Sequence, residues 1–359
     1  MSLNTSEAKR IGTEKLNALI DKGQSQATAV IERIHTDIPR DLIAPMGRVT
    51  FQADEHVIRM NLLRDGTAPE VMDLHKNAFG QAMERASIPA SYASHLVEKG
   101  PWGSELLADN LTRTFAHDTR KVLVRSVRGT ARGILSDRYR RIDSRPMVDA
   151  FGAALARVGA VVCSGTADDT RVSLQAIIPV IFEPLPNEVI VFGCSYSNSD
   201  YGRGPSDLRL YFNRLTCLNG AIGTDTLHQI HLGKRLSENV EFSQQTYDYD
   251  TKCVTSALGD VIVGAFAKEQ IERTVGLLRA SNAKRLEAKE VETILAKSKL
   301  SKNEQTEIVE AYTSAEMEMI PPGQTAYRLS NAISWVAQKK DPDKLLDYQR
   351  LAGSLVMPD

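Results

Sequence analysis

Residues 121–135 read KVLVRSVRGTARGIL, and the pattern of the chain changes from helical to strand-like at this point. Valine recurs through the first half of the stretch, which is typical of a strand. The triplet Arg128-Gly129-Thr130 separates this run from a second apolar run at 131–135. Glycine tolerates the backbone angles of a tight turn, so the sequence predicts a β-hairpin here.

The hairpin introduces a strand-rich central third of the chain. A helix is predicted over residues 146–158, because apolar residues recur there at helical spacing. Strands are predicted at about 159–163, 171–178, 188–194, 207–213 and 226–231. Too few helices separate these strands for a doubly wound parallel sheet, so the fold class indicated is α+β.

The regions on both sides of the central third have apolar residues at helical spacing. In the first of them, Gly23 is expected to interrupt an N-terminal helix over residues 5–35. We therefore predict three parts: a helical N-terminal region (1–115), a central α+β domain (116–238) and a helical C-terminal region (239–359).

The composition is that of an ordinary globular protein. The chain has 359 residues, of which 42% are hydrophobic and 25% charged, so a sizeable core can form. Its four cysteines form no C-x-x-C pair, and their spacing predicts neither a disulfide framework nor a zinc site. With no secretory-type apolar stretch and no run of about 20 apolar residues, we expect a cytoplasmic protein without a membrane span.

The charge is strongly segregated along the chain. The whole sequence has a net charge of -1, but residues 111–145 hold nine arginines and one lysine against three aspartates. This stretch therefore carries +7 and the remainder -8. Arginine has a planar fork of donors that grips phosphate with two hydrogen bonds and stacks on bases.

These properties favour single-stranded nucleic acid as a partner, because a basic groove can follow the backbone while an aromatic ring stacks a base. In this hypothesis the arginines hold phosphates and Tyr139 stacks. The candidate nucleic-acid-binding residues are Arg120, Lys121, Arg128, Arg132, Arg138, Tyr139, Arg140 and Arg141. The alternative is a set of structural ion pairs at a domain or subunit boundary, formed with the acidic remainder of the chain. Side chains alternate along a strand, so only part of the set can line one groove.

Other motifs give weaker signals. Residues 74–99 have the rhythm of a helix-turn-helix, but the second helix begins without basic residues and is expected to pack rather than read DNA. The polar loop of residues 195–200, followed by Gly202 and Gly204, has the composition of a phosphate-cradling loop but lacks a Walker pattern.

Nothing in the sequence favours catalysis. No catalytic signature such as G-x-S-x-G, H-E-x-x-H or a Walker lysine is present, and we expect no cofactor. His228 and His231 form an H-x-x-H pair near Asp225, which leaves a metal-dependent nuclease as a third hypothesis. The context indicates a strand, where i and i+3 side chains point to opposite faces, so a polar structural role is favoured.

Several blocks resemble one known family. Residues 132–143 read RGILSDRYRRID, similar to the R-x-x-L-S-D-R-Y-R-x-x-D block of the phage and plasmid proteins named domain of unknown function nine-three-two. Further blocks agree in order over about residues 70–235, with Ser87 and Asp200 as departures from the common Gly and Glu. The other similar blocks are residues 86–92, 192–200, 215–220, 231–233 and, more loosely, 325–337.

The resemblance implies a mobile-element protein acting in DNA metabolism, defence or counter-defence. Some members are similar to single-strand annealing recombination proteins, whose strand-rich cores carry a basic groove and assemble into rings. The leading hypothesis is therefore single-stranded DNA binding or annealing in phage or plasmid recombination by a homo-oligomer. The alternative is a self-assembling protein-interaction module that does not bind DNA, in which the acidic remainder meets the basic stretch of a neighbouring subunit.

Overall fold

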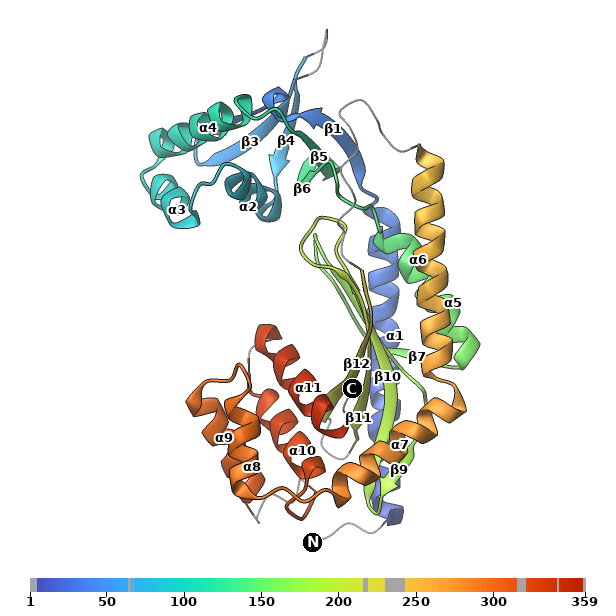
Figure 1. The fold of residues 1–359 in the computed structure, drawn as a ribbon. Coiled ribbons are helices and arrows are strands. Elements are labelled where there is room, and N and C mark those ends of the chain that lie inside the picture. Colours follow the sequence, from blue (N-terminus) through green and yellow to red (C-terminus); the bar gives the residue numbers. More distant parts are fainter. Residues whose placement is uncertain are drawn as a thin grey trace.

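The computed structural model describes residues 5–63, 66, 68–215, 219–229, 243–314, 321–340 and 342–357. The chain forms an upper sheet with three helices, a long central sheet, and a lower bundle of helices, as Figure 1 shows. Helices at both ends of the chain flank the strand-rich part, which confirms the α+β class. None of the described helices is both long and apolar enough to cross a bilayer.

The upper sheet has six strands in the order β1-β5-β6-β4-β3-β2. The predicted hairpin supplies two of its inner strands, β5 and β6. Arg128 and Gly129 both take positive φ at its turn, which matches the twist of the flanking strands. Helices α2 (Lys76–Arg85), α3 (Ala90–Glu98) and α4 (Pro101–Ala116) share an apolar core with this sheet. The strands are β1 (Arg40–Pro45), β2 (Val49–Asp54), β3 (Val57–Leu62), β4 (Glu70–Leu74), β5 (Lys121–Val127) and β6 (Thr130–Ser136).

The upper sheet contains strands from both sides of the predicted domain boundary between residues 115 and 116. Four of its strands come from the first 115 residues, a region whose sequence indicated mostly helices. Strand β1 pairs along its whole length with β5, so that Arg40 lies opposite Ser126. Such pairing joins segments far apart in the sequence and leaves little trace in local periodicity.

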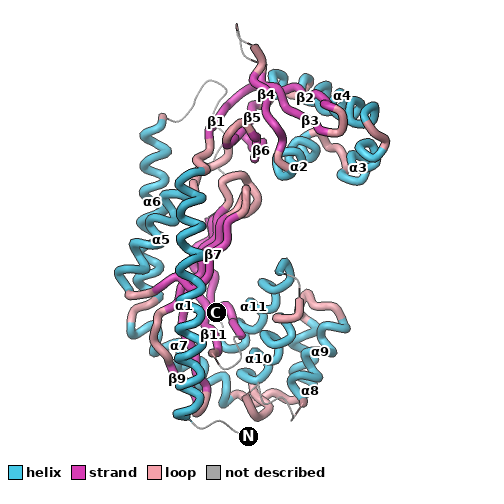
Figure 2. Tube along the Cα trace, turned by 180° about the vertical axis from the view of Figure 1, so that it is seen from behind, coloured by secondary structure: helices cyan, strands magenta, loops and turns pink. Residues whose placement is uncertain are grey.

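The central sheet is antiparallel, with the order β12-β11-β10-β8-β7 and a short strand β9 beside β10. Its strands are β7 (Val161–Ala167), β8 (Val172–Ile177), β9 (Phe182–Leu185), β10 (Glu188–Asn198), β11 (Ser206–Arg214) and β12 (Asn219–Gln229). Figure 2 shows helix α1 (Thr5–Thr36) running along this sheet, with α5 (Ser144–Val158) and α6 (Gln244–Ala265) beside it.

Strand β10 connects three apolar cores. Val189 and Val191 pack with the first half of α1. On the other face, Tyr196 joins the core formed with α5 and α6, whereas Ile190 and Phe192 join the core of the lower bundle. The bundle consists of α7 (Lys268–Ala283), α8 (Ala288–Ala296), α9 (Lys302–Thr313), α10 (Ala326–Ala337) and α11 (Pro342–Val356).

Gly23 does not interrupt α1, contrary to the sequence-based expectation. The helix is continuous, and Gly23 lies where its backbone meets strand β7: an added Cβ would be 2.3 Å from the Cα of Cys163. The glycine is therefore a packing requirement, because only a residue without a side chain lets the helix approach the strand this closely.

We expect Gly23→Ala to destabilise the protein by about 1–3 kcal/mol, because the helix must move away from β7. Gly276→Ala is the matched control, since Gly276 lies in α7 with nothing within 4 Å of an added Cβ. This control should be neutral or stabilising by up to about 1 kcal/mol, the helix-propensity gain. Urea unfolding of both variants measures the difference, and equal free energies of unfolding would contradict the packing role.

Candidate nucleic-acid interface

The guanidinium of Arg125, on β5, is buried between the upper and central sheets. Its side chain is 1% exposed, and its Nε lies 2.7 Å from an oxygen of Asp41 on β1. Its Nη1 lies 2.7 Å from Asp143, next to the start of α5, and donates to the carbonyl of Asp200 at 2.8 Å. A buried charge is tolerated only when it is paired and hydrogen-bonded, and this one is paired across three elements.

Asp200 completes this site from the loop after β10. Its Oδ1 accepts hydrogen bonds from the backbone N–H and the hydroxyl of Ser144, both at 2.7 Å, and from the amide of Asn198 at 3.1 Å. Burial, together with the charge of Asp143, raises the pKa of Asp200 to about 6, although Arg125 opposes the shift. Residues 195–198 of the predicted polar loop belong instead to strand β10. The Asn198 and Asp200 side chains point inward and hold the start of α5.

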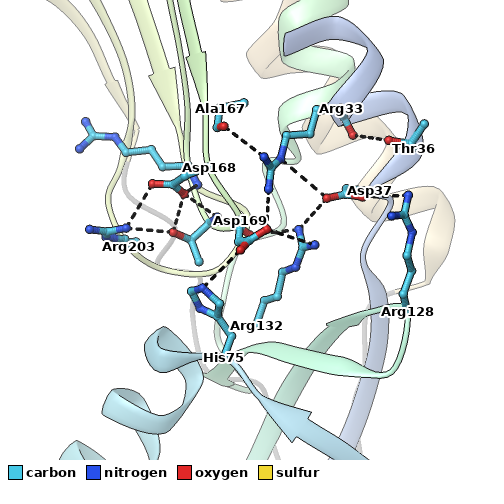
Figure 3. Close-up of polar contacts among 12 residues, drawn as sticks. Arg33, Thr36, Asp37, His75, Arg128, Arg132, Ala167, Asp168, Asp169 and Arg203 are labelled. Carbon is cyan, nitrogen blue, oxygen red and sulfur yellow. Dashed lines mark hydrogen bonds and ion pairs between the residues drawn. The ribbon is translucent and has the colours of Figure 1, made fainter. Parts of the chain in front are cut away.

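A second polar group, which we call the arginine cluster, lies at the surface of the same junction (Figure 3). It brings arginines from four segments together with three aspartates. Its members are Arg33 of α1, Arg128 and Arg132 of the β5–β6 hairpin, Arg171 of the β7–β8 turn, Arg203 of the β10–β11 loop, and Asp37, Asp168 and Asp169.

The aspartates of the arginine cluster each contact more than one cation or donor. Asp37 lies 2.9 Å from Arg132 and 3.3 Å from Arg128. Asp169 pairs with Arg33 and lies 3.5 Å from Arg132. Five arginines face these three aspartates and the neighbouring Asp200, so the arginines exceed the carboxylates by one.

A turn between β7 and β8 positions two of these aspartates. Oδ1 of Asp168 accepts hydrogen bonds from the N–H and hydroxyl of Thr170 and from the N–H of Arg171, at 2.7–2.8 Å. Burial opposes ionisation here, but these hydrogen bonds prevail and lower the pKa of Asp168. The other oxygen of Asp168 lies 3.2 Å from Arg203. The turn therefore anchors Arg203 as well as orienting Arg171.

A small pocket with a volume of about 30 Å³ lies within the arginine cluster. It is lined by Arg33, Arg132 and Arg171, and Asp200 forms part of its wall. This volume is enough for a single water molecule. A larger anion such as a phosphate group would be held at the surface, where the Arg128 and Arg203 side chains are 71% and 48% exposed.

The prediction that Tyr139 stacks a nucleic-acid base is wrong for this structure. Its side chain is buried, and its hydroxyl donates to the carbonyl of Ser199 at 2.8 Å. Burial raises the pKa of Tyr139 far above its ordinary value. The ring packs with Leu123 and Leu135 of the hairpin, so its role is to join the β10–β11 loop to the upper sheet.

The other predicted residues divide between the junction and the surface. Arg140 pairs with Asp250 of α6, and Arg141 lies 3.1 Å from Asp41 and 4.6 Å from the ring centre of Tyr247. Both are largely buried and act as structural ion pairs, the alternative weighed for this stretch.

Arg120, Lys121 and Arg138 lie outside the arginine cluster. Arg120 is half-exposed and pairs with its neighbour Asp118 at 2.5 Å. Lys121 is half-buried at the start of β5, and Arg138 is exposed on the connection between β6 and α5. Of the eight predicted residues, only Arg128 and Arg132 belong to the cluster.

Sequence reasoning missed Arg33, Arg171 and Arg203. Each stands apart from the basic stretch, and the fold brings them to it. The one local signal was the glycine-flanked position of Arg203 in the loop that had been considered for phosphate binding. The aspartate pair at residues 168–169, directly before a threonine and Arg171, is also typical of a tight polar turn.

The metal hypothesis stays a prediction. His231 lies outside the described residues, and the side chain of His228 is likewise not described. In the part of the chain that the structure describes, no group of three or more His, Cys, Asp or Glu side chains is arranged to hold a metal ion.

The helix-turn-helix segment corresponds to α2 and α3, where Ala93 and Leu96 of α3 are buried in the core of the upper sheet.

No family model, curated protein or solved structure matches the chain.

The raised pKa of Asp200 predicts a pH dependence of stability. Because the folded state binds this proton more tightly than the unfolded chain, its contribution to stability is complete below about pH 4. It is lost as the pH rises through about 6. The free energy of unfolding of the wild type relative to Asp200→Asn should therefore fall by about 1–3 kcal/mol between pH 4 and 7.5.

Urea unfolding at pH 4, 6 and 7.5 measures this difference. Asp168→Asn is the matched control, because the lowered pKa of Asp168 acts in the opposite direction. The wild type should exceed this control variant most at neutral pH, and the excess should shrink as the pH falls through the ordinary range of an aspartate. If the difference in free energy of unfolding between the wild type and Asp200→Asn does not change with pH, Asp200 does not titrate in this range.

Proposed function

We propose that the protein binds single-stranded nucleic acid through the backbone phosphates, and that the arginine cluster is the binding site. The observation that carries the proposal is the convergence of five arginines from four segments on one exposed junction. Three carboxylates lie among them and a fourth, Asp200, lies in the pocket wall, so the arginines exceed the carboxylates by one. Annealing in phage or plasmid recombination is the role that the family resemblance suggests for such binding.

The chemistry of the arginine cluster fits phosphate better than a small ligand. Its guanidinium groups are held in place by hydrogen bonds to Asp37, Asp168 and Asp169, which reduces the entropy lost when an anion binds. The side chains of Arg128 and Arg203 are exposed to solvent and offer donors to phosphate oxygens. The pocket of about 30 Å³ is too small to enclose a nucleotide.

Binding of this kind has a distinct signature. Because Tyr139 is buried, stacking falls to the exposed guanidinium planes, and the phosphate contacts dominate the affinity. We therefore expect a weak sequence preference and an affinity that falls steeply with salt as counterions are released.

Self-assembly through charge is less well supported. The second hypothesis places the acidic partners of the basic stretch on a neighbouring subunit. Here Arg125, Arg132 and Arg140 find their aspartates within the same chain. Assembly of a homo-oligomer stays a prediction, and light scattering at low and high salt would measure it.

The proposal predicts that Arg128→Ala combined with Arg203→Ala weakens binding to a fluorescent single-stranded oligonucleotide. If each arginine contacts one phosphate, the slope of log affinity against log salt should decrease by about 0.7 per residue removed. Fluorescence anisotropy across a salt series, with unlabelled duplex as competitor, measures both quantities.

Arg113→Ala is the matched control, because Arg113 is 76% exposed on α4 and pairs only locally, with Asp109 at 2.8 Å. It removes one positive charge elsewhere on the surface, compared with two in the double variant, and should leave the slope unchanged. The proposal fails if the wild type does not bind at low salt, or if the double variant keeps the wild-type slope.

A further inference from the structure

A cavity of about 240 Å³ lies at the elbow between α6 and α7, beside strands β10 and β11. Figure 1 shows this elbow, where α6 ends and α7 begins. Phe192 and Phe212 of the sheet form one wall, Phe266 and Ile271 of the elbow another, and Met357, just after α11, a third. Phe266 and Ile271 pack against the cores of both the central sheet and the lower bundle. The cavity therefore lies where these two cores meet.

The size and lining of this cavity suit an apolar group. Apolar cavities of about 150 Å³ remain dry and bind benzene, so one of this volume has room for roughly eight to ten carbon atoms. Well-packed interiors rarely leave such a space unfilled, because each lining side chain loses contacts across it. An occupant that restores those contacts would be stabilised by the burial of its own apolar surface.

One face of α7 gives the cavity a polar end. Gln270, Arg273 and Thr274 line it at helical spacing, and both Gln270 and Arg273 are exposed, so this end opens to solvent. Among the side chains that the structure describes, no aspartate or glutamate lines the cavity. An arginine at the mouth of a largely apolar cavity selects for a negative charge on the ligand.

We propose that this cavity binds a small anionic amphiphile, a medium-chain carboxylate, with its tail among the phenylalanines and its carboxylate at Arg273. The site is separate from the arginine cluster, which lies at the junction with the upper sheet. A bound tail would fill the space between the central sheet and the lower bundle. It would also stabilise the folded chain by mass action.

Isothermal titration calorimetry of the full chain with octanoate tests this proposal, with octanamide as the uncharged ligand of the same length. We expect saturable binding of one octanoate per chain. Thr274→Trp should fill the cavity and reduce the affinity for both ligands at least tenfold. Leu277→Phe, which fills it from the next turn of α7, provides a second variant if the first does not fold.

Arg273→Gln separates the head group from the tail. It should lower the affinity for octanoate about three- to tenfold, as expected for a partly exposed charge-assisted hydrogen bond, and leave the affinity for octanamide unchanged. Lys268→Gln is the matched control, because Lys268 is 83% exposed on the same helix but does not line the cavity.

Three outcomes would overturn the proposal. The first is that the wild type shows no saturable binding of octanoate. The second is that neither cavity-filling variant reduces the affinity. The third is that Arg273→Gln lowers the affinity for octanoate and for octanamide equally. The first two would exclude the cavity as the site, and the third would exclude Arg273 as the partner of the carboxylate.

Discussion

The buried guanidinium of Arg125 constrains how the upper and central sheets are joined. Transfer of such a charge from water into the protein costs several kcal/mol, and the cost is offset only if every donor finds an acceptor. Arg125 donates to Asp41 on β1 and to the carbonyl of Asp200 in the loop after β10, and it forms an ion pair with Asp143 beside the start of α5. All three elements must be in place before the hydrogen bonds and ion pairs of Arg125 can all form. The junction is therefore defined by hydrogen-bond geometry as well as by apolar packing.

The same requirement accounts for four of the nine arginines in residues 111–145, namely Arg125, Arg132, Arg140 and Arg141. Part of the stretch forms the hairpin of the upper sheet, and its next few residues lead to α5 beside the central sheet. The arginines that face the junction find aspartates there, whereas Arg128, at the turn, keeps most of its surface in solvent. One basic segment thus serves two purposes. Its buried members hold the sheets together, and its exposed end adds charge to the arginine cluster.

The arginine cluster depends on the Arg125 site because the two share backbone elements. The loop that carries Asp200 also carries Arg203, and the N–H of Arg203 donates to the hydroxyl of Ser199 at 2.9 Å. Asn77 and Gln81 of α2 donate to the carbonyl of Tyr201 in the same loop. A change at the buried site would therefore displace Arg203 at the surface. The cavity at the α6–α7 elbow lies beyond this network and is bounded mainly by apolar side chains, with Gln270, Arg273 and Thr274 at its open end.

The sequence by itself determined the elements whose signals are local. The hairpin at 121–136 and helix α5, which ends before Gly159, were predictable. Their signals are a turn glycine and the spacing of apolar residues, and both extend over only a few residues of sequence. The pairing of β1 with β5 and the close contact at Gly23 were not, since each depends on a partner segment far along the chain. For the candidate site, the basic stretch was evident, but its division into buried and exposed arginines was decided only by tertiary structure. Arg125 and Asp41 are 84 residues apart, and Arg140 and Asp250 are 110 apart. The sequence alone shows where the arginine charges are. Which carboxylate pairs with each arginine, and that Tyr139 is buried, depends on how the two sheets pack together.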